Sequence, residues 1–119
     1  MGTIQNTDPT RYQHPLDKKA LAALKKLPGR MVHITAPGSN GYDCCSRCFG
    51  PKIGILEDPV CGSAHCQIIP YWAKRLGKNT IRAWEASSRG GDLTGEIIDN
   101  NIIKIIGKAC TFSVSELSL

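Results

Sequence analysis

The segment from Gly62 to Leu76 constrains the fold more than any other part of the chain, because it is typical of a helix that is apolar around most of its circumference. Its apolar residues are Ala64, Ile68, Ile69, Trp72, Ala73 and Leu76, and its strongly polar ones are Gln67, Lys74 and Arg75. A helix with so few polar positions lies inside its domain. Gly77 follows directly and predicts the end of the helix. Whatever fold the chain adopts must cover this helix.

Short segments on both sides of the helix predict strands, and in residues 31–35 apolar and polar side chains alternate. They cover residues 31–35 and 42–49 before the helix, and residues 80–87, 93–98, 102–106 and 109–114 after it. Turns rich in Gly, Asp and Asn join the last four strands, as in antiparallel hairpins. Residues 50–59, punctuated by prolines and a glycine, indicate irregular structure. The predicted fold class is α+β, with a curled, mostly antiparallel sheet around one buried central helix.

The chain length predicts one domain. With 119 residues there is room for one modest domain and not for two. Residues 1–15 are polar and broken by Pro9 and Pro15, and we expect an N-terminal tail there. Residues 16–119 are then a single lobe, which opens with a helix that Asp17 caps and that Pro28 and Gly29 end.

The apolar runs of the chain and its first residues indicate where the protein is located. No apolar run approaches the roughly 20 residues of a membrane-spanning helix. The first residues lack the hydrophobic stretch of a signal peptide. We therefore expect a cytoplasmic protein without a membrane partner.

The net charge of +5 raises the question of a nucleic-acid partner. The densest basic clusters are Lys18, Lys19, Lys25 and Lys26 in the first predicted helix, and Lys74, Arg75 and Lys78 at the end of the second. A nucleic-acid surface would combine such charges with aromatic residues on one face. These clusters instead suit a solvated helix face and the C-terminal end of a helix dipole. No nucleic-acid partner is expected.

Six cysteines in a short chain could indicate disulfides or a metal site. Disulfides are not expected in a reducing compartment. Cys45 and Cys48 have the spacing of zinc ligands, and Cys61, His65 and Cys66 follow. In a strand, however, residues three apart point to opposite faces, so Cys45 and Cys48 could not share a metal there. Small buried thiols are the preferred interpretation, with no metal.

Residues 57–65 place two carboxylates, a thiol, a hydroxyl and an imidazole at the start of the buried helix. The first N–H groups of a helix are unpaired and carry partial positive charge, so they bind anions such as carboxylates. Gly62, Ser63 and Ala64 are the candidate binding residues, and Asp58 lies far enough ahead to act on a bound ligand. The alternative is a plain capped helix with Ser63 as N-cap and Asp58 as a turn residue. The residues alone leave both interpretations open.

Four motifs resemble, in order and spacing, those of the phenazine biosynthesis-like (PhzF-like) family of isomerases. They are Ser46-Arg47-Cys48-Phe49-Gly50-Pro51, the block Gly54-Ile55-Leu56-Glu57-Asp58-Pro59-Val60-Cys61-Gly62-Ser63-Ala64-His65, then Pro70-Tyr71-Trp72, and Ser88-Arg89-Gly90-Gly91. The likeness covers about residues 16–114, and the block that ends at His65 is its most specific part.

The resemblance implies the fold of the diaminopimelate epimerases, in which two similar lobes each curl a sheet around a central helix. The active site of that fold lies between the lobes, and this chain resembles the C-terminal lobe alone. The implied reaction is a cofactor-independent isomerisation by proton transfer on a small carboxylic acid. In family members, the Asp that matches Asp58 assists the reaction, and the Gly and Ser that match Gly62 and Ser63 hold the substrate carboxylate.

This sequence departs from the family pattern at three points. The catalytic Glu of the family lies in the N-terminal lobe, which has no counterpart here. Cys61 replaces the usual Thr, and Glu85 replaces the usual Gln. Related epimerases have a catalytic Cys before a Gly at a similar helix start, so Cys61 joins Asp58 as a candidate catalytic residue. A helix N-terminus favours a thiolate, and we expect Cys61 to be the most reactive of the cysteines. The alternative is that Cys61 replaces a Thr of similar size and has no catalytic role.

Three functions remain open at this stage. The first is an isomerase or epimerase whose site is completed by self-association. The second is a non-catalytic module that binds small anions, and the third is a half-enzyme that docks on a separately encoded N-terminal lobe. A lone lobe exposes the apolar surface that its partner would cover, so we expect a homodimer or a higher homo-oligomer.

Three further residues near the motifs have open or supporting roles. His65 is either a ligand donor or a histidine that packs beneath the loop before the helix. Arg47 and Arg89 are expected to hold loops in place through salt bridges rather than to touch substrate.

Overall fold

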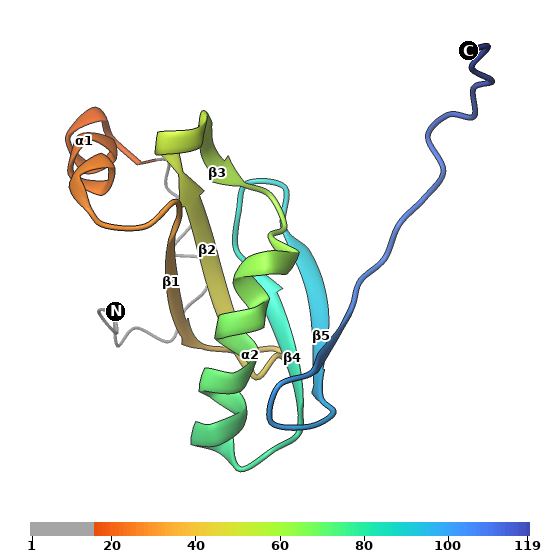
Figure 1. The fold of residues 1–119 in the computed structure, drawn as a ribbon. Helices are drawn as coiled ribbons and strands as arrows, with labels where there is room; N and C mark the ends of the chain where they lie inside the picture. Colours follow the sequence, from red (N-terminus) through yellow and green to blue (C-terminus); the bar gives the residue numbers. More distant parts are fainter. Residues whose placement is uncertain (1–15) are drawn as a thin grey trace.

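The computed structural model describes residues 16–119 as a six-stranded sheet with one long helix on one of its faces (Figure 1). The helices are α1 (Lys18–Lys26), α2 (Gly62–Leu76) and the short 3-10 helix η2 (Pro51–Ile53). The strands are β1 (Val32–Pro37), β2 (Cys44–Gly50), β3 (Ile55–Asp58), β4 (Thr80–Glu85), β5 (Gly91–Ile97) and β6 (Ile103–Ile106). The predicted tail, residues 1–15, lies outside the described residues.

The sheet is mixed but mostly antiparallel, as predicted. The strand order is β1-β2-β4-β5-β6, and β3 pairs with β2 off this path. Among these pairs only β2 and β4 are parallel, with Cys44 opposite Ala83 and Ser46 opposite Glu85. The crossover between these two parallel strands contains α2, as parallel pairing requires. The predicted fold class is therefore confirmed.

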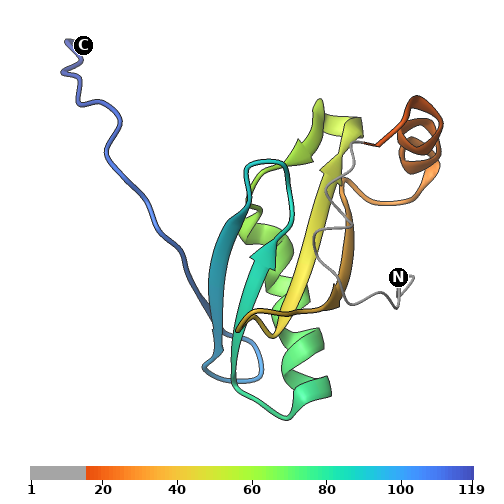
Figure 2. The same ribbon diagram turned by 180° about the vertical axis from the view of Figure 1, so that it is seen from behind.

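Helix α2 packs along one face of the sheet, and the view from behind shows the strands in front of it (Figure 2). Its sheet-facing residues are buried: Ala64, His65, Ile68, Ile69, Trp72 and Ala73. Contact between helix and sheet is close, since a Cβ on Gly95 of β5 would lie 2.4 Å from Cγ1 of Ile69. The other side of the helix is exposed, which corrects the prediction of burial all round. The sheet covers this helix on one side only, so Leu76 remains exposed.

The ends of both helices match their sequence signals. The side chain of Asp17 caps α1 by accepting a hydrogen bond of 2.7 Å from the N–H of Ala20. Gly77 ends α2 in the left-handed conformation with φ of 64°, which costs a glycine no steric strain. Both outcomes confirm the predicted boundaries.

Two predictions on strands were wrong. Residues 50–59, expected to be irregular, contain η2 and β3, and β3 pairs with β2. Residues 109–114, expected to be a strand, form none, and the chain after β6 runs away from the sheet (Figures 1 and 2). Phe112 and Val114 there are 99% and 91% exposed. In residues 109–114, Cys110, Phe112 and Val114 alternate with smaller or more polar residues, as in a strand. A strand also needs a hydrogen-bonding neighbour, however, and this segment has none within residues 16–119.

Candidate active site

The first turn of α2 is open to solvent and has no side-chain cap. Cys61 is the N-cap residue and makes no capping hydrogen bond through its side chain. Gly62 and Ser63 are exposed, while Ala64 is buried against the sheet. A Cβ on Gly62 would meet no heavy atom within 4 Å. The backbone at Gly62 and Ser63 is therefore accessible to a ligand, as anion binding at a helix N-terminus requires.

Asp58 is the last residue of β3 and lies half-buried just ahead of this turn. It is opposite Cys48 in the pairing of β3 with β2. Its Oδ1 accepts a hydrogen bond of 3.2 Å from the N–H of Val60, which fixes the bend of the chain toward α2. Asp58 thus has the turn role of the plain alternative and retains its other oxygen, Oδ2, for a ligand.

The residue before it, Glu57, ties β3 to the middle of the sheet. Its two carboxylate oxygens accept hydrogen bonds of 2.7 Å from Nε and Nη2 of Arg47. This two-point arrangement is the strongest geometry for an arginine and a carboxylate. The prediction that Arg47 holds a loop through a salt bridge is confirmed. Arg89 is exposed, and the described residues show no salt bridge for it.

The thiol of Cys61 points back into the protein. The residue is 4% exposed, and its Sγ lies 3.5 Å from the Oγ of Ser63. Cys66 and Cys110, in contrast, are exposed. This difference in access argues against Cys61 as the most reactive cysteine of the folded chain, whatever its intrinsic reactivity.

The backbone of Cys61 is held on both sides by buried side chains. Oε2 of Glu85, the last residue of β4, accepts a hydrogen bond of 2.6 Å from the Cys61 N–H. Nδ1 of His65 lies 2.7 Å from the Cys61 carbonyl oxygen. Glu85 and His65 are both fully buried, at 0% exposure. The buried side chains of Glu85 and His65 therefore hold the start of α2, while Gly62 and Ser63 stay exposed to solvent.

His65 packs beneath the loop and does not reach the surface as a ligand donor. Its Nδ1 carries the proton, because a carbonyl oxygen only accepts hydrogen bonds. Its Nε2 then accepts from Oγ of Ser46, 3.4 Å away on β2. Burial lowers the pKa of His65, which favours this neutral form. The packing interpretation of His65 is the one that the geometry supports.

The two residues between Asp58 and Cys61 are anchored by the turn between β4 and β5. Oγ of Ser87 donates a hydrogen bond of 2.7 Å to the carbonyl oxygen of Pro59 and accepts one of 3.0 Å from the Gly90 N–H. A Cβ on Gly91 would lie 2.1 Å from Cγ2 of Val60. Only glycine therefore allows this approach, and the Gly90-Gly91 motif serves to hold the site loop.

An open pocket of about 400 Å³ lies beside the first turn of α2. Its lining residues are Gly29, Arg30, Met31, His33, Ser63, Ala64 and Gln67. Nδ1 of His33 is buried without a hydrogen-bond partner in the described structure, and burial lowers the pKa of His33. Sequence analysis missed Arg30 and His33 as site residues. The loop and strand that carry them reach the helix start only through the β1–β2 pairing, which no local motif reveals.

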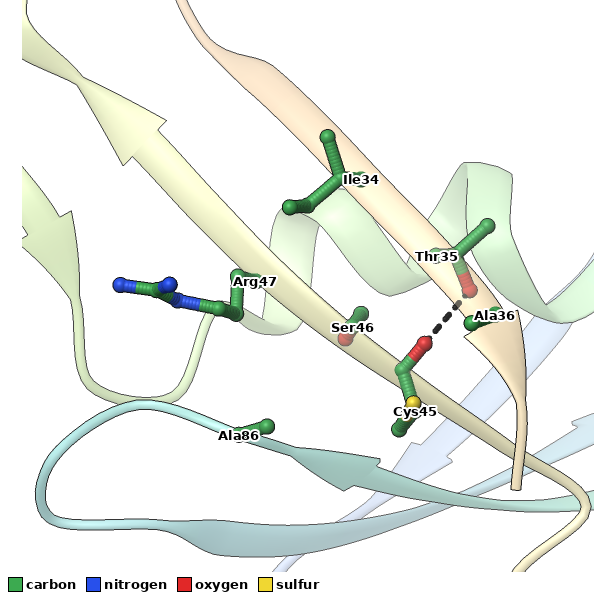
Figure 3. Close-up of a pocket in the computed structure, with 7 residues that line it drawn as sticks. All are labelled: Ile34, Thr35, Ala36, Cys45, Ser46, Arg47 and Ala86. Carbon is green, nitrogen blue, oxygen red and sulfur yellow. Dashed lines mark hydrogen bonds between the residues drawn. The ribbon is translucent and has the colours of Figure 1, made fainter. Parts of the chain in front are cut away.

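Two other hollows do not contain the candidate residues. One is a space of about 10 Å³ over β1, β2 and the end of β4, where Oγ1 of Thr35 donates to the carbonyl oxygen of Cys45 over 2.7 Å (Figure 3). That volume holds one water molecule at most. The other, about 740 Å³ and open, lies at the far end of α2 near Lys74, Lys78 and Asp99. Neither includes Asp58, Cys61 or Ser63.

Four of the six cysteines are buried, and Cys66 and Cys110 are exposed. Cys44 and Cys48 belong to the buried core, and Cys45, on the opposite face of β2, has its Sγ 3.7 Å from the carbonyl oxygen of Pro37. Burial raises the pKa of the Cys44 thiol to about 12. In residues 16–119 no group of three or more His, Cys, Asp or Glu side chains is arranged to hold a metal ion. Within the same residues no helix is long and apolar enough to cross a membrane.

The plain capped-helix alternative is only partly correct. Cys61, not Ser63, occupies the N-cap position, because the helix begins at Gly62. Ser63 is the second helical residue. Of the predicted site residues, the structure brings Asp58, Cys61, Gly62, Ser63 and Ala64 together around the start of α2.

Known proteins resemble this chain in sequence and in structure. The family model described as phenazine biosynthesis-like protein matches residues 7–115, so the match begins inside the predicted tail. An uncharacterized isomerase of Pseudomonas aeruginosa is 42% identical over 110 residues, which is 87% of this chain and 42% of that protein. A phenazine biosynthesis-like domain-containing protein of Homo sapiens is 39% identical over 92 residues, or 77% of this chain and 30% of that protein.

A solved structure of a putative phenazine biosynthesis PhzC/PhzF protein from Clostridium difficile is also similar. It superimposes with a TM-score of 0.78 and is 35% identical, and the match covers 98% of this chain and 44% of that one. The chain thus spans less than half the length of the relatives compared. Its fold, its motifs and the family match together show that the chain belongs to the phenazine biosynthesis-like (PhzC/PhzF) family.

Proposed function

We propose that this chain is one lobe of a PhzF-like isomerase or epimerase that moves a proton on a small carboxylic acid without a metal or organic cofactor. One observation carries the proposal. The uncapped, solvent-open first turn of α2 lies directly after the half-buried carboxyl group of Asp58. A binding group for a carboxylate and a group that can take a proton are thereby adjacent.

The substrate carboxylate would bind at the N–H groups of Gly62, Ser63 and Ala64. The positive end of the helix dipole favours an anion there, and the Ser63 hydroxyl adds a donor. Arg30 lines the neighbouring pocket and adds positive charge on that side. The uncharacterized isomerases among the relatives support the same reaction class for this chain.

The proposed chemistry is a proton transfer with Asp58 as the base. Its carboxylate takes a proton from carbon, the C–H bond breaks and an O–H bond forms on Asp58. The electron pair moves into the conjugated carboxylate, whose developing charge the helix N-terminus stabilises. A proton returns to a different carbon or to the opposite face, which gives an isomer or an epimer. Cys61 is the second candidate acid or base, since its Sγ lies 3.5 Å from Ser63 Oγ.

We further propose that self-association completes the site. This chain spans less than half the length of the matched relatives, and a second copy would supply the lobe that faces it. Apolar side chains are exposed at the site end of the molecule, on η2 and β3: Ile53, Ile55 and Leu56. The extended segment after β6 exposes Phe112, Val114 and Leu117 as well. Exposed apolar surface of this kind favours a partner, and a second copy is the simplest one.

Solvent deuterium exchange tests the reaction. The protein is incubated in D₂O with a panel of small carboxylic acids that carry exchangeable C–H bonds, and incorporation is read by NMR and mass spectrometry. We expect exchange that depends on protein concentration, because two copies form the site. Asp58→Asn should abolish it. The matched control is Asp99→Asn in the exposed turn before β6, where Oδ1 accepts two backbone hydrogen bonds that asparagine can also accept. Exchange by the Asp58→Asn variant at the unaltered rate would refute the role of Asp58.

Sulfate titration tests the anion site separately. The second helical position accepts proline, since a first-turn N–H has no helical acceptor. Ser63→Pro should therefore keep the helix, remove one N–H and weaken sulfate binding. Ser63→Ala removes only the hydroxyl and should weaken it less. Equal affinity in both variants and the unaltered protein would place the anion elsewhere.

The half-enzyme alternative has one observation in its favour. The match to the solved structure covers 98% of this chain, including the extended segment after β6. That segment is unpaired within residues 16–119, yet its extended form suits a strand in a larger assembly. Light scattering at high micromolar concentration separates the two ideas. A monomer would favour a different chain as partner, and a dimer would favour self-association.

A further inference from the structure

We propose that Glu85 is a positioning residue for the candidate site, which clamps the start of α2 through the Cys61 N–H and does so as the uncharged carboxylic acid. Glu85 combines burial with incomplete hydrogen bonding, which is unusual for an acidic side chain. Glu85 is a fully buried acidic side chain, one of its oxygens accepts a hydrogen bond of 2.6 Å, and the other, Oε1, has no hydrogen-bond partner.

The surroundings of Glu85 oppose a charge. On β2 it faces Ser46, its partner in the sheet, and the thiol of Cys48, which acts as a hydrogen-bond donor to the carboxyl group. On β3 it faces the acidic side chains of Asp58 and Glu57, and Glu57 is already paired with Arg47.

The start of α2 adds no positively charged side chain. It contributes Cys61 and, one turn further, His65 in its neutral form. Gly91, the partner of Glu85 on β5, has no titratable group. No salt bridge to Glu85 occurs among the described residues.

An ionised carboxylate in this position would be costly. A buried charge without a counter-charge is among the least stable arrangements in a protein interior. A protonated Glu85 places one neutral oxygen on the Cys61 N–H and keeps its proton on the other. Burial, together with the charges of Asp58 and Glu57, raises the pKa of Glu85, although the hydrogen bonds from the Cys61 N–H and the Cys48 thiol act in the opposite direction.

The protonation state of Glu85 has a consequence for the site. The carboxyl group of Glu85 lies at the N-terminal end of α2, where its Oε2 accepts the hydrogen bond from the Cys61 N–H. If it ionised, its charge would occupy the same positive field that would attract a substrate carboxylate. A neutral Glu85 leaves that field to the ligand while still fixing the backbone of Cys61. This last step rests on the proposed function, whereas the clamp itself does not.

The pH dependence of stability follows from the sign of the shift. A carboxyl group whose pKa is raised by folding contributes most below its ordinary value of 4.5. That contribution is lost as the pH rises through the pKa of the folded protein. Replacement by glutamine mimics the neutral acid in shape and charge, so Glu85→Gln should remove this loss. Glu85→Ala removes the clamp altogether and should lower the midpoint of unfolding at every pH.

The decisive experiment is a pH titration followed by NMR. The side-chain carboxyl carbon of Glu85 is labelled with ¹³C, and the amide of Cys61 is followed in the same samples from pH 4 to pH 9. We expect the Glu85 carbon to titrate above the ordinary glutamate range and the Cys61 amide to shift with the same midpoint. In Glu85→Gln the shift of the Cys61 amide should disappear, and unfolding midpoints should become less dependent on pH.

Two outcomes would overturn the inference. One is a Glu85 carbon that titrates at or below the ordinary range, and the other is a Cys61 amide that does not follow it. Sulfate binding forms a separate arm, in which affinity should fall with rising pH in the unaltered protein and change less in Glu85→Gln. If sulfate binds neither protein, the proposed anion site fails, but the NMR titration still decides the state of Glu85. If Glu85 only held the backbone in place, Glu85→Gln would be as stable as the unaltered protein. The Glu85 carbon and the Cys61 amide of the unaltered protein would then not titrate together.

Discussion

The Nδ1–H group of His65 donates a hydrogen bond of 2.7 Å to the carbonyl oxygen of Cys61, one turn earlier in the chain. This contact fixes the tautomer of a fully buried imidazole and orients the peptide bond that opens α2. Its Nε2 continues the chain of contacts to Ser46 on β2. The start of α2 is thus connected to the middle of the sheet through a neutral histidine, and this connection can be tested.

Replacement of His65 by phenylalanine should destabilise the fold. The change fills similar space but leaves the Cys61 carbonyl and the Ser46 hydroxyl without their partner, and each buried unsatisfied group costs about 1–3 kcal/mol. Urea unfolding measures the loss. His33→Gln is the matched control, because Nδ1 of His33 has no partner to lose. A loss in the control as large as in His65→Phe would show that the hydrogen bonds are not the cause.

The same histidine predicts part of the acid sensitivity. Burial lowers the pKa of His65, so the unfolded chain takes up a proton on it more readily than the folded one. Its contribution to stability is therefore present above the ordinary value of 6.5 and is lost as the pH falls below that value. Urea midpoints between pH 5 and pH 8 should decline toward acid, and His65→Phe should reduce the slope. An unchanged slope would assign the acid sensitivity to His33 or to other groups.

The salt bridge between Arg47 and Glu57 should stabilise β3 more than a surface pair would. Both side chains are largely buried, at 6% and 22% exposure, and the two-point geometry is strong. Glu57→Gln should cost about 2–4 kcal/mol, since it replaces the charged partner of a buried two-point ion pair by a neutral one. Glu96→Gln breaks an exposed pair with Lys104 at 3.2 Å and should cost less than about 1 kcal/mol. Equal losses in the two variants would mean that burial does not strengthen the inner pair.

Local signals in the sequence predicted the elements that depend on local chemistry. Asp17 and Gly77 marked helix ends, and the apolar pattern after Gly62 predicted α2. Strand β3 was missed because Pro51, Gly54 and Pro59 surround it, and only its pairing with β2 makes it a strand. The strand predicted at residues 109–114 was wrong for the opposite reason. Its residues alternate as in a strand, but no neighbour within the described chain pairs with them.

The candidate site was predictable to the extent that it lies in one motif. Asp58, Cys61, Gly62 and Ser63 are close in sequence, so the motif that named them also brought them together. The clamp by Glu85 and the pocket residue His33 come from other strands, and only the sheet topology places them at the helix start. The sequence showed Glu85 as a departure from the family pattern, but its burial could not be predicted from position alone.

Cysteine alkylation should follow exposure in the folded protein. Cys66 and Cys110 are exposed and should react first. Cys61 is buried and should react more slowly, at a rate set by opening of the loop before α2. Cys44 should be among the last, because burial raises the pKa of its thiol to about 12 and leaves almost no thiolate at neutral pH. Site-resolved mass spectrometry measures the order, with urea-unfolded protein as the control. Modification of Cys61 ahead of Cys66 would revive the idea of an activated thiol at the helix start.

Gly62→Ala offers the sharpest separation of stability from binding. A Cβ at this position meets no heavy atom within 4 Å, so the substitution introduces no clash in the free protein. Alanine also has a higher helix propensity than glycine, so the free energy of unfolding should rise by up to about 1 kcal/mol. The new methyl group would, however, occupy the open space through which an anion approaches the first-turn N–H groups. Sulfate affinity should therefore fall about tenfold, or about 1.4 kcal/mol.

The matched control for Gly62→Ala is Leu76→Ala at the exposed C-terminal end of the same helix. It also changes helix propensity but leaves the first turn untouched, so sulfate affinity should stay the same. Calorimetric titration gives the affinities, and thermal unfolding gives the stabilities of the same samples. A Gly62→Ala variant that gains stability and loses sulfate binding would locate the anion at the helix N-terminus. If it binds sulfate as tightly as Leu76→Ala does, no anion contacts the backbone at Gly62, and Asp58 has no neighbouring carboxylate on which to act.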